Sequence, residues 1–522
     1  RKESSAASDV YKRQIPRWVS RRGVQLSRQR AHHLPDSQLL CLPALRQRHP
    51  GASVPGERQD IHGGSRPQLS QRAWAAPSDD LNWHGLSSPL ALIAMRRCCP
   101  CGHLGYPATV IVDPGSARLC ARTVSISDPG PLENYMTPND SVCFLHRNYG
   151  MVGLGEVTRF ETDSPAAADV WWEALCDDLE HETEMPGAEA TGPVAFGSFT
   201  FDPDRSSSRS VMILPKTIIG RWPGYSWLTQ LSWDSITDNS PHQQSVPRPP
   251  GAVTVRDGVV SERSWRQVAR LVQDIMSPGE LDQIVLMRDV EAKAASSIDP
   301  RWIVETLRRQ FPNAYTYLVE GSVGTTSKLT VGVSKSLITS RVLTHSPATD
   351  ANHQTLLTAL QGKGPLAAYH DEIVGRTCAR LEQFCDTVHV PDCPGCVYND
   401  ASTYLVTDVT GINSPDQGSC LALVQALCPP AFVTGLPPHC ALSVLAEVEH
   451  VDRGRVSGPT GWVDSLGNGQ WVTDCRGGQI DATDPSLVHI FSGHPVGHDD
   501  DADVLSAEAE HRIDVLRDLF LT

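Results

Sequence analysis

The clearest hydrophobic pattern lies in the second half of the chain. Apolar residues recur every three or four positions in Ser264–Met276, Leu366–Phe384 and Ser506–Leu519, which predicts three amphipathic helices. Gln283–Val290 and Val194–Phe201 have the apolar or alternating character of strands, and the second is predicted to be half-buried. Helices and strands mix without a regular βαβ period. The pattern therefore favours a layered α+β fold in a single large domain over a doubly wound sheet.

The first part of the chain lacks such a pattern. Residues 1–105 scatter Arg, Ser, Gln, Pro and His among short apolar pieces, whereas periodic segments begin near residue 106. A Pro-rich stretch, Pro241–Gly251, then punctuates the chain. We expect a leader over 1–105 and a domain over 106–522, with an N-terminal part at 106–250 and a core at 251–522.

Charge is distributed unevenly along the 522 residues. Residues 1–105 hold 16 Lys and Arg against 7 Asp and Glu, a local charge of +9. Since the whole chain carries −15, residues 106–522 carry −24. Arg1–Gln14 resembles a translated sequencing adapter, and we interpret the leader as a non-native segment. A disordered leader and a nucleic-acid-binding arm are the alternatives. The arm has few aromatic residues for stacking on bases, so nucleic acid is not the expected partner.

The fifteen cysteines are typical of reduced thiols in a cytoplasmic protein, because their number is odd and they are spread through a long chain. The alternative is a four-thiolate zinc site built from two clusters, Cys98–Cys101 and Cys393–Cys396, although their spacing is not that of a zinc finger. No apolar run approaches the roughly 18 residues of a membrane-spanning helix. We expect a cytoplasmic monomer without a membrane partner.

Generic catalytic signatures are missing from the sequence. It contains no Walker loop, GxSxG elbow, HExxH or GxGxxG motif after a strand. The densest acidic run, His498–Asp503, has two interpretations. It is either a metal site or the solvated N-terminus of a helix, where carboxylates complement the helix dipole.

Three ordered motifs resemble one family. Gln283–Arg288 (QIVLMR) matches K-V-V-L-A-R, and Leu427–Pro437 (LCPPAFVTGLP) follows L-H-P-T-P-A-V-G-G-x-P without a gap. Asp452–Asp464 (DRGRVSGPTGWVD) matches D-R-G-x-Y-A-G-P-V-G-W-x-D. From about residue 106 onward the chain therefore resembles the chorismate-utilising enzymes, most strongly after residue 261. Within that family it is similar to the isochorismate synthases of menaquinone and siderophore pathways.

The resemblance implies Mg²⁺-dependent conversion of chorismate to isochorismate. In that reaction water attacks C2 of the ring and the C4 hydroxyl leaves, which requires a base, an acid and a cation. The family's water-activating Lys falls at Gln283. Its acid Glu, in the motif G-A-S-P-E-L-L, is placed at Ser336 by matching Gly332–Ile338, and both residues are substitutions.

The metal positions implied by the resemblance are also altered. In the helix motif K-D-x-x-E-H the ligand Glu is replaced by Tyr369. In the C-terminal E-x-x-E the first Glu is replaced by Leu505, so Glu508 is the remaining carboxylate. Mg²⁺ is usually held by one or two carboxylates with substrate and water, so Glu508 alone predicts a weak site.

Several implied substrate contacts are kept. Asp474-Cys475-Arg476 matches A-I-R, whose arginine pairs with a carboxylate, and Arg512 stands where the family has Lys. Ser346 retains a hydroxyl at the end of the L-A-G-T turn, and Gly493 opens the A-G-A-G-I-V turn. Pro495 replaces the second glycine of that turn and removes a backbone donor.

Two functions remain open on the sequence. One is an isochorismate synthase, and the other is a non-catalytic homologue that keeps the fold and binds chorismate, a related dianion or a protein partner. Loss of acid and base groups lowers a rate by about 10²–10⁴-fold each, so the sequence predicts an inactive or very slow enzyme.

Overall fold

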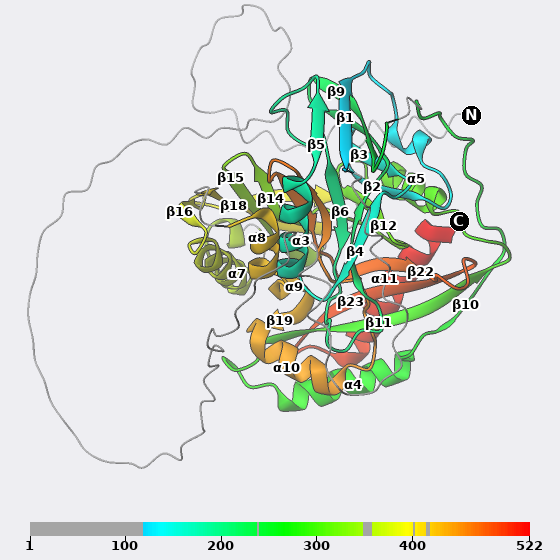
Figure 1. Cartoon of the computed structure of the whole chain (residues 1–522). Coiled ribbons are helices and arrows are strands. Elements are labelled where there is room, and N and C mark those ends of the chain that lie inside the picture. Colours follow the sequence, from blue (N-terminus) through cyan, green and yellow to red (C-terminus); the bar gives the residue numbers. More distant parts are fainter. Residues whose placement is uncertain are drawn as a thin grey trace, which may run out of the picture. The chain divides into compact units, whose positions relative to one another are not determined.

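Two β-sheets stacked face to face form the centre of the molecule in the computed structural model (Figure 1). The structure describes residues 118–236, 240–347, 356, 358–399, 402–413 and 418–521. These residues fall within one compact unit, Gly85–Thr522. The leader over 1–105 and its cysteine cluster, Cys98–Cys101, lie outside the described residues.

The first sheet carries the strands that bear most candidate site residues. Its neighbours run antiparallel except for the parallel pair β1 and β5. In spatial order the strands are β10 (Val253–Asp257), β11 (Gln283–Ala294), β23 (Leu487–Gly497), β22 (Arg476–Ile480), β13 (Ser322–Thr326), β12 (Tyr315–Val319), β2 (Ser141–His146), β3 (Tyr149–Leu154), β8 (Thr217–Trp222), β9 (Tyr225–Ser232), β1 (Cys120–Ser125) and β5 (Glu180–Thr183), with β19 (Gly435–Leu436) pairing with β11.

The second sheet is antiparallel throughout its described pairs. Its strands are, in order, β16 (Cys385–His389), β18 (Ser402–Asn413), β15 (Leu337–Pro347), β14 (Leu329–Ser334), β21 (Gly469–Val472), β20 (Thr460–Asp464), β6 (Val194–Ser198), β7 (Ser210–Leu214) and β4 (Thr158–Thr162), with β17 (Gly395–Asn399) pairing with β18. The predominance of antiparallel pairs confirms the expected α+β class.

Helices cover the outer faces of both sheets. Helices α3, α7 and α8 pack on the second sheet and on one another, while α4, α5, α10 and α11 pack along the first (Figure 1). Their bounds, with the short helices η1 and α9, are η1 (Leu132–Tyr135), α3 (Pro165–Asp177), α4 (Glu262–Ile275), α5 (Pro300–Gln310), α7 (Pro365–Leu381), α8 (Cys420–Leu427), α9 (Ala431–Thr434), α10 (Pro438–Val448) and α11 (Ala502–Leu521).

The largest hydrophobic core lies between the sheets. Phe144 and Trp227 from the first sheet join Phe196, Trp462 and Trp471 from the second, and each is at most 1% exposed. All five residues of β6 are buried, so the predicted half-buried strand is wrong. This strand is covered on both faces, by the first sheet and by helices, and its apolar run is typical of that position.

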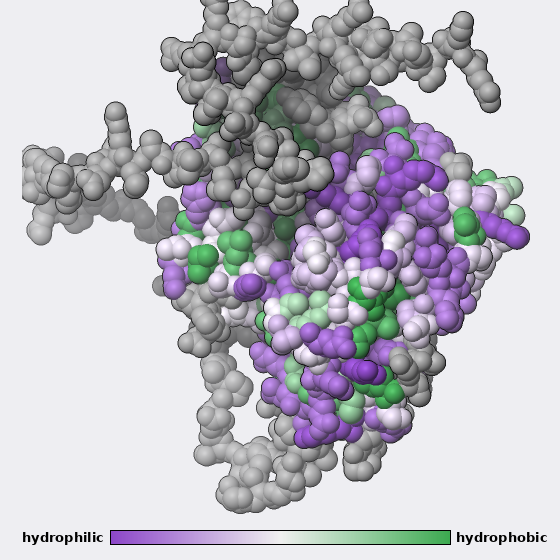
Figure 2. Space-filling view, turned by 90° about the horizontal axis from the view of Figure 1, so that it is seen from above, coloured by the Kyte–Doolittle hydropathy of each residue, from purple (hydrophilic) through white to green (hydrophobic). Residues whose placement is uncertain are grey.

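The face shown in Figure 2 is mostly hydrophilic, with apolar side chains in small groups. The predicted helices agree closely with α4, α7 and α11. No helix among the described residues is long and apolar enough to cross a membrane.

A buried ion pair fastens one end of the first sheet. Arg453 is 3% exposed; its Nε donates to Glu449 Oε2 at 2.7 Å, and its Nη atoms donate to the carbonyls of Val433 and Val285 at 2.7 Å each. Glu449 Oε1 in turn accepts the Met287 amide at 2.8 Å. The guanidinium lies 4.1 Å above the Phe201 ring. The arginine of the D-R-G motif therefore joins β11, α9 and α10.

Removal of this arginine should destabilise the fold strongly. We expect Arg453→Met to lower the free energy of unfolding by roughly 3–5 kcal/mol, because Glu449 would remain buried without its charge partner. Urea denaturation followed by circular dichroism measures the change. The control is Arg270→Met, which breaks an exposed pair with Asp503 and should cost at most about 1 kcal/mol. Equal effects of the two substitutions would contradict the role given to Arg453.

Candidate active site

The residues at the base position and at one metal-ligand position meet each other. Gln283 begins β11, and Tyr369 lies in the second turn of α7. The Tyr369 hydroxyl donates a hydrogen bond to Gln283 Oε1 at 2.5 Å. Burial raises the pKa of the Tyr369 phenol, so it is neutral and acts as a donor. The two side chains satisfy each other, and neither supplies a charge.

His370, the next residue, fixes the orientation of α7. It is 1% exposed; its Nδ1 lies 2.8 Å from Thr344 Oγ1 in β15 and its Nε2 lies 2.7 Å from Thr407 Oγ1 in β18. Burial lowers the pKa of His370, which keeps the imidazole neutral between the two hydroxyls. The histidine of the E-H motif thus attaches α7 to the second sheet and sets where Tyr369 points.

Positive charge gathers where β22 and α11 come together. Arg476 is the first residue of β22, its side chain is 40% exposed, and Asp474 and Tyr404 raise its pKa. Arg512 of α11 is close enough to Arg476 and Glu508 for all three to interact electrostatically. Burial lowers the pKa of Arg512, but an arginine stays protonated at neutral pH. The structure therefore brings the two predicted anion-binding arginines together.

A lysine that the sequence analysis did not single out belongs to the same region. Lys328 lies in the turn between β13 and β14, and its Nζ is 3.3 Å from Asp474 Oδ1 and 4.3 Å above the centre of the Phe432 ring. Its side chain is 14% exposed and the Asp474 side chain only 1%. Burial acts to raise the pKa of Asp474, but Lys328 and Arg476 outweigh it and hold this pKa below the usual value. Asp474 is therefore an ionised carboxylate beside Arg476.

Ser336, the predicted acid position, is separated from this group. It is exposed in the two-residue turn between β14 and β15, where Ser334 pairs with Leu337. Ser346 lies ten residues further along β15, or roughly 33 Å at the rise of an extended strand. The segment Gly324–Thr330, GTTSKLT, keeps the glycine and the first leucine of G-A-S-P-E-L-L and has Lys328 at the glutamate. The hairpin thus places Ser336 at the opposite end of β14 from Lys328.

The predicted backbone contact is already used inside the sheet. The Gly493 amide donates to the Cys475 carbonyl at 2.6 Å, and a Cβ at Gly493 would lie 2.7 Å from Cys475 Cβ. The glycine is therefore needed for the close approach of two strands and has no free donor. Pro495 pairs with Val285 in β23 and β11. Ser346 pairs with Thr403 in the backbone, and its side chain lies outside the described residues.

The expected Mg²⁺ ligands do not form a metal site. Leu505 is 8% exposed and packs in the core between α4, α10 and α11. Glu508 is half exposed and lies 3.3 Å from His494 Nε2, while Tyr369 is bonded to Gln283. Among the residues that the structure describes, no three His, Cys, Asp or Glu side chains are grouped to hold a metal ion. The donor set therefore does not fit Mg²⁺, which prefers several oxygen ligands.

The acidic run and the second cysteine cluster have plainer roles. Asp501 Oδ1 accepts the amide of Asp503 at 2.8 Å, and Asp500 Oδ2 accepts the amide of Gly497 at 2.7 Å. Asp501 thus stabilises the first turn of α11 and Asp500 the turn that precedes it, which favours the helix-terminus interpretation. Cys393 is exposed and Cys396 is half-buried, and both are free thiols.

Comparison with known proteins agrees with the motif resemblance. The family model described as chorismate binding enzyme matches residues 118–518. The chain belongs to this family. It is 26% identical over 356 residues to the salicylate biosynthesis isochorismate synthase of Pseudomonas aeruginosa, covering 62% of this chain and 72% of that protein. It is 24% identical to isochorismate synthase MenF of Bacillus subtilis, covering 70% of this chain and 83% of that protein.

The fold has solved counterparts. The menaquinone-specific isochorismate synthase MenF of Escherichia coli superposes with a TM-score of 0.63, at 19% identity, over 77% of this chain and 95% of the other. Anthranilate synthase component I of Streptococcus pneumoniae superposes with a TM-score of 0.56, at 13% identity, over 82% of this chain and 97% of the other. The layered α+β architecture is therefore that of the chorismate-binding family.

The pair of Lys328 and Asp474 predicts a pH-dependent defect. In Lys328→Met the buried Asp474 loses its main partner, so its pKa should rise above the unfolded value of about 3.9. When the native pKa of a carboxyl group is raised, the folded state loses no stability at pH values below the unfolded pKa. The loss of folding stability grows as the pH rises above the unfolded pKa. We expect the loss in unfolding free energy to be roughly 3 kcal/mol at pH 7 and clearly smaller at pH 4.

Urea denaturation at both pH values measures this difference. Lys328→Met combined with Asp474→Ala is the control and should lose the extra destabilisation at pH 7. A Lys328→Met defect that is the same at pH 4 and pH 7 would show that Asp474 does not depend on Lys328.

Proposed function

We propose that this protein binds chorismate or a closely related dicarboxylate and does not catalyse Mg²⁺-dependent formation of isochorismate. The observation that carries the proposal is the contrast between two sets of positions. Arg476 and Arg512 remain close together as anion-binding cations. The base and metal positions hold Gln283 and Tyr369, bonded to each other.

General-base chemistry is missing at Gln283. An amide side chain has no proton-accepting group that titrates near neutral pH, whereas activation of water requires one. Tyr369 does not replace it, because burial raises the pKa of its phenol and the phenol proton is donated to Gln283. The bonded pair can offer hydrogen bonds to a bound hydroxyl or carboxylate, which supports binding but not proton transfer.

General-acid chemistry is missing as well. We place the family's acid position at Lys328, because Gly324–Thr330 fits the motif and Lys328 lies beside Arg476 through Asp474. The side chain at this position is an ammonium group bound to Asp474 rather than the carboxylic acid that the motif supplies. Asp474 cannot act as the acid either, since its lowered pKa keeps it ionised.

The charges that remain suit a dianion without a metal. Lys328, Arg476 and Arg512 contribute three positive charges, and Asp474 and Glu508 contribute two negative ones. The site therefore keeps a net positive charge in a chain that is acidic overall. Carboxylates bind arginine through short, charge-assisted hydrogen bonds, so Arg476 and Arg512 are the groups expected to meet the ligand.

We expect the purified chain to form no isochorismate from chorismate and Mg²⁺ at enzymatic rates. Reversion of five positions, Gln283→Lys, Lys328→Glu, Asp474→Ala, Tyr369→Glu and Leu505→Glu, should raise the rate by at least about 10⁴-fold, since base and acid each contribute about 10²–10⁴. Product is measured by chromatography after timed incubation.

A matched variant tests the placement of the acid. It carries Gln283→Lys, Tyr369→Glu and Leu505→Glu with Ser336→Glu in place of the changes at Lys328 and Asp474, and it should stay inactive. Turnover by the unmodified chain at ordinary rates would refute the proposal and establish an isochorismate synthase. If the variant with Ser336→Glu gains activity and the five-position variant does not, the acid position lies at Ser336 and not at Lys328.

We expect the chain to bind chorismate although it does not convert it to isochorismate. Isothermal titration with chorismate should give saturable binding that differs by less than about threefold between Mg²⁺ and EDTA buffers. Arg476→Met should weaken it by roughly tenfold or more, the cost of one charge-assisted hydrogen bond. Arg270→Met, on the exposed face of α4, is the control with unchanged affinity. Absence of chorismate binding by the unmodified chain would exclude the ligand proposed.

A further inference from the structure

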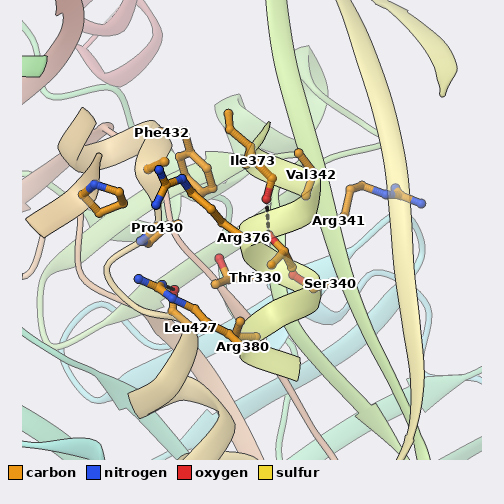
Figure 3. Close-up of a pocket in the computed structure, with 13 residues that line it drawn as sticks. Thr330, Ser340, Arg341, Val342, Ile373, Arg376, Arg380, Leu427, Pro430 and Phe432 are labelled. Carbon is orange, nitrogen blue, oxygen red and sulfur yellow. Dashed lines mark hydrogen bonds between the residues drawn. The ribbon is translucent and has the colours of Figure 1, made fainter. Parts of the chain in front are cut away.

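A cavity lies along α7, on the face of the helix that also carries Tyr369. It has a volume of about 40 Å³ and is enclosed by α7, by β14 and β15, and by the turn that leads into α9 (Figure 3). Phe432 lines it, and the same ring carries Lys328 at 4.3 Å from its centre. The cavity therefore adjoins the arginine site through Phe432 but is built from different residues.

Two arginines of α7 extend across this cavity. Arg376 and Arg380 are four residues apart, so they project from the same side of the helix (Figure 3). Arg380 Nη1 donates to the Leu427 carbonyl at 3.3 Å, and Arg380 forms no ion pair with any described carboxylate. Arg376 shares its charge with Glu372, whose Oε1 accepts from Nε at 3.0 Å and from Nη2 at 2.7 Å. The cavity thus has one fully uncompensated cation and one partly compensated cation.

The third lining cation does not contribute. Arg341 points away from the cavity in Figure 3, and Asp408 holds its guanidinium through two hydrogen bonds of 2.7 Å. The charged side chains that line this space and are not held by Asp408 are therefore Arg376 and Arg380, the first of them paired with Glu372.

A buried hydroxyl lies on the same cavity. Thr330 is 5% exposed, and its Oγ1 has no hydrogen-bond partner among the residues that the structure describes. Its hydroxyl lies between the Arg376 and Arg380 side chains in the view of Figure 3. Buried hydroxyls are almost always hydrogen-bonded, so this one calls for a bound group with an acceptor or donor. By contrast, the neighbouring Thr377 hydroxyl already donates to the Ile373 carbonyl at 2.9 Å.

We propose that this cavity binds a small oxyanion, held by Arg380 and Arg376 and by the Thr330 hydroxyl. A water needs about 10–15 Å³ of such space, so about 40 Å³ admits one group the size of phosphate or a carboxylate but not a whole chorismate. The arginines supply planar, paired donors for the anion, and the threonine donates to a further oxygen. A phosphate and a carboxylate both offer oxygen acceptors to these donors, and the experiment distinguishes the two anions.

The test is isothermal titration of the full chain with inorganic phosphate and, separately, with succinate. We expect saturable binding of at least one of them with a Kd of about 1 mM or below. Arg380→Met should weaken it by roughly tenfold or more, and Thr330→Val, which keeps the shape and removes the hydroxyl, by about threefold. Arg341→Met is the matched control, because Arg341 also lies at the edge of the cavity but its guanidinium points away from it. This substitution should change the affinity by less than about twofold.

Arg476→Met separates this site from the first one. Binding that persists in Arg476→Met and is lost in Arg380→Met supports the second site. Binding that is lost in Arg476→Met and kept in Arg380→Met overturns it, as does the absence of saturable binding for both anions. Circular dichroism spectra confirm that each variant is folded, and Thr330→Val provides the test if Arg380→Met is not.

Discussion

The buried guanidinium of Arg453 is the interaction on which the arrangement of the site depends. A buried charge is costly unless its donors are satisfied, and here they meet the Glu449 carboxylate and the carbonyls of Val285 and Val433. Val285 lies two residues after Gln283, and Val433 directly follows Phe432, the ring that supports Lys328. One side chain therefore fixes both the strand that begins the candidate site and the turn that separates it from the second cavity.

Two pairs of polar residues in the site are bound to each other. The Tyr369 hydroxyl is bonded to Gln283, and Lys328 to Asp474. An active site normally retains groups whose pKa lies near the working pH, whereas here Tyr369 is shifted upward and Asp474 downward. Both shifts move the group further from titration at neutral pH. What remains is a fixed pattern of hydrogen bonds and positive charge, which suits recognition of an anion better than transfer of a proton.

Much of the architecture follows from local pattern, and the errors have identifiable physical causes. Helices α4, α7 and α11 were predictable from apolar spacing, because each buries one face against a sheet. Strand β6 was predicted half-buried and is wholly buried, because no single strand reveals how many layers cover it. The motif match predicts the acid position at Ser336, whereas the hairpin pairing of Ser334 with Leu337 places this residue at the far end of β14 from Lys328. The proximity of Arg476 and Arg512 depends on the packing of α11 beside β22, which spacing along the chain does not encode.

Lys328 and Asp474 form a buried ion pair in which each charge stabilises the other. With glutamate at position 328, Asp474 would be a buried carboxylate facing a second one, and like charges at close range cannot both ionise. With alanine at position 474, as in A-I-R, Lys328 would lie at 14% exposure without its carboxylate. Asp474 also has Arg476 at 3.8 Å, and with Lys328 it forms an ion pair at 3.3 Å. The pair gives this region an electrostatic arrangement different from the one that the motifs imply, on a fold in which Arg453 keeps the arginine of the D-R-G motif.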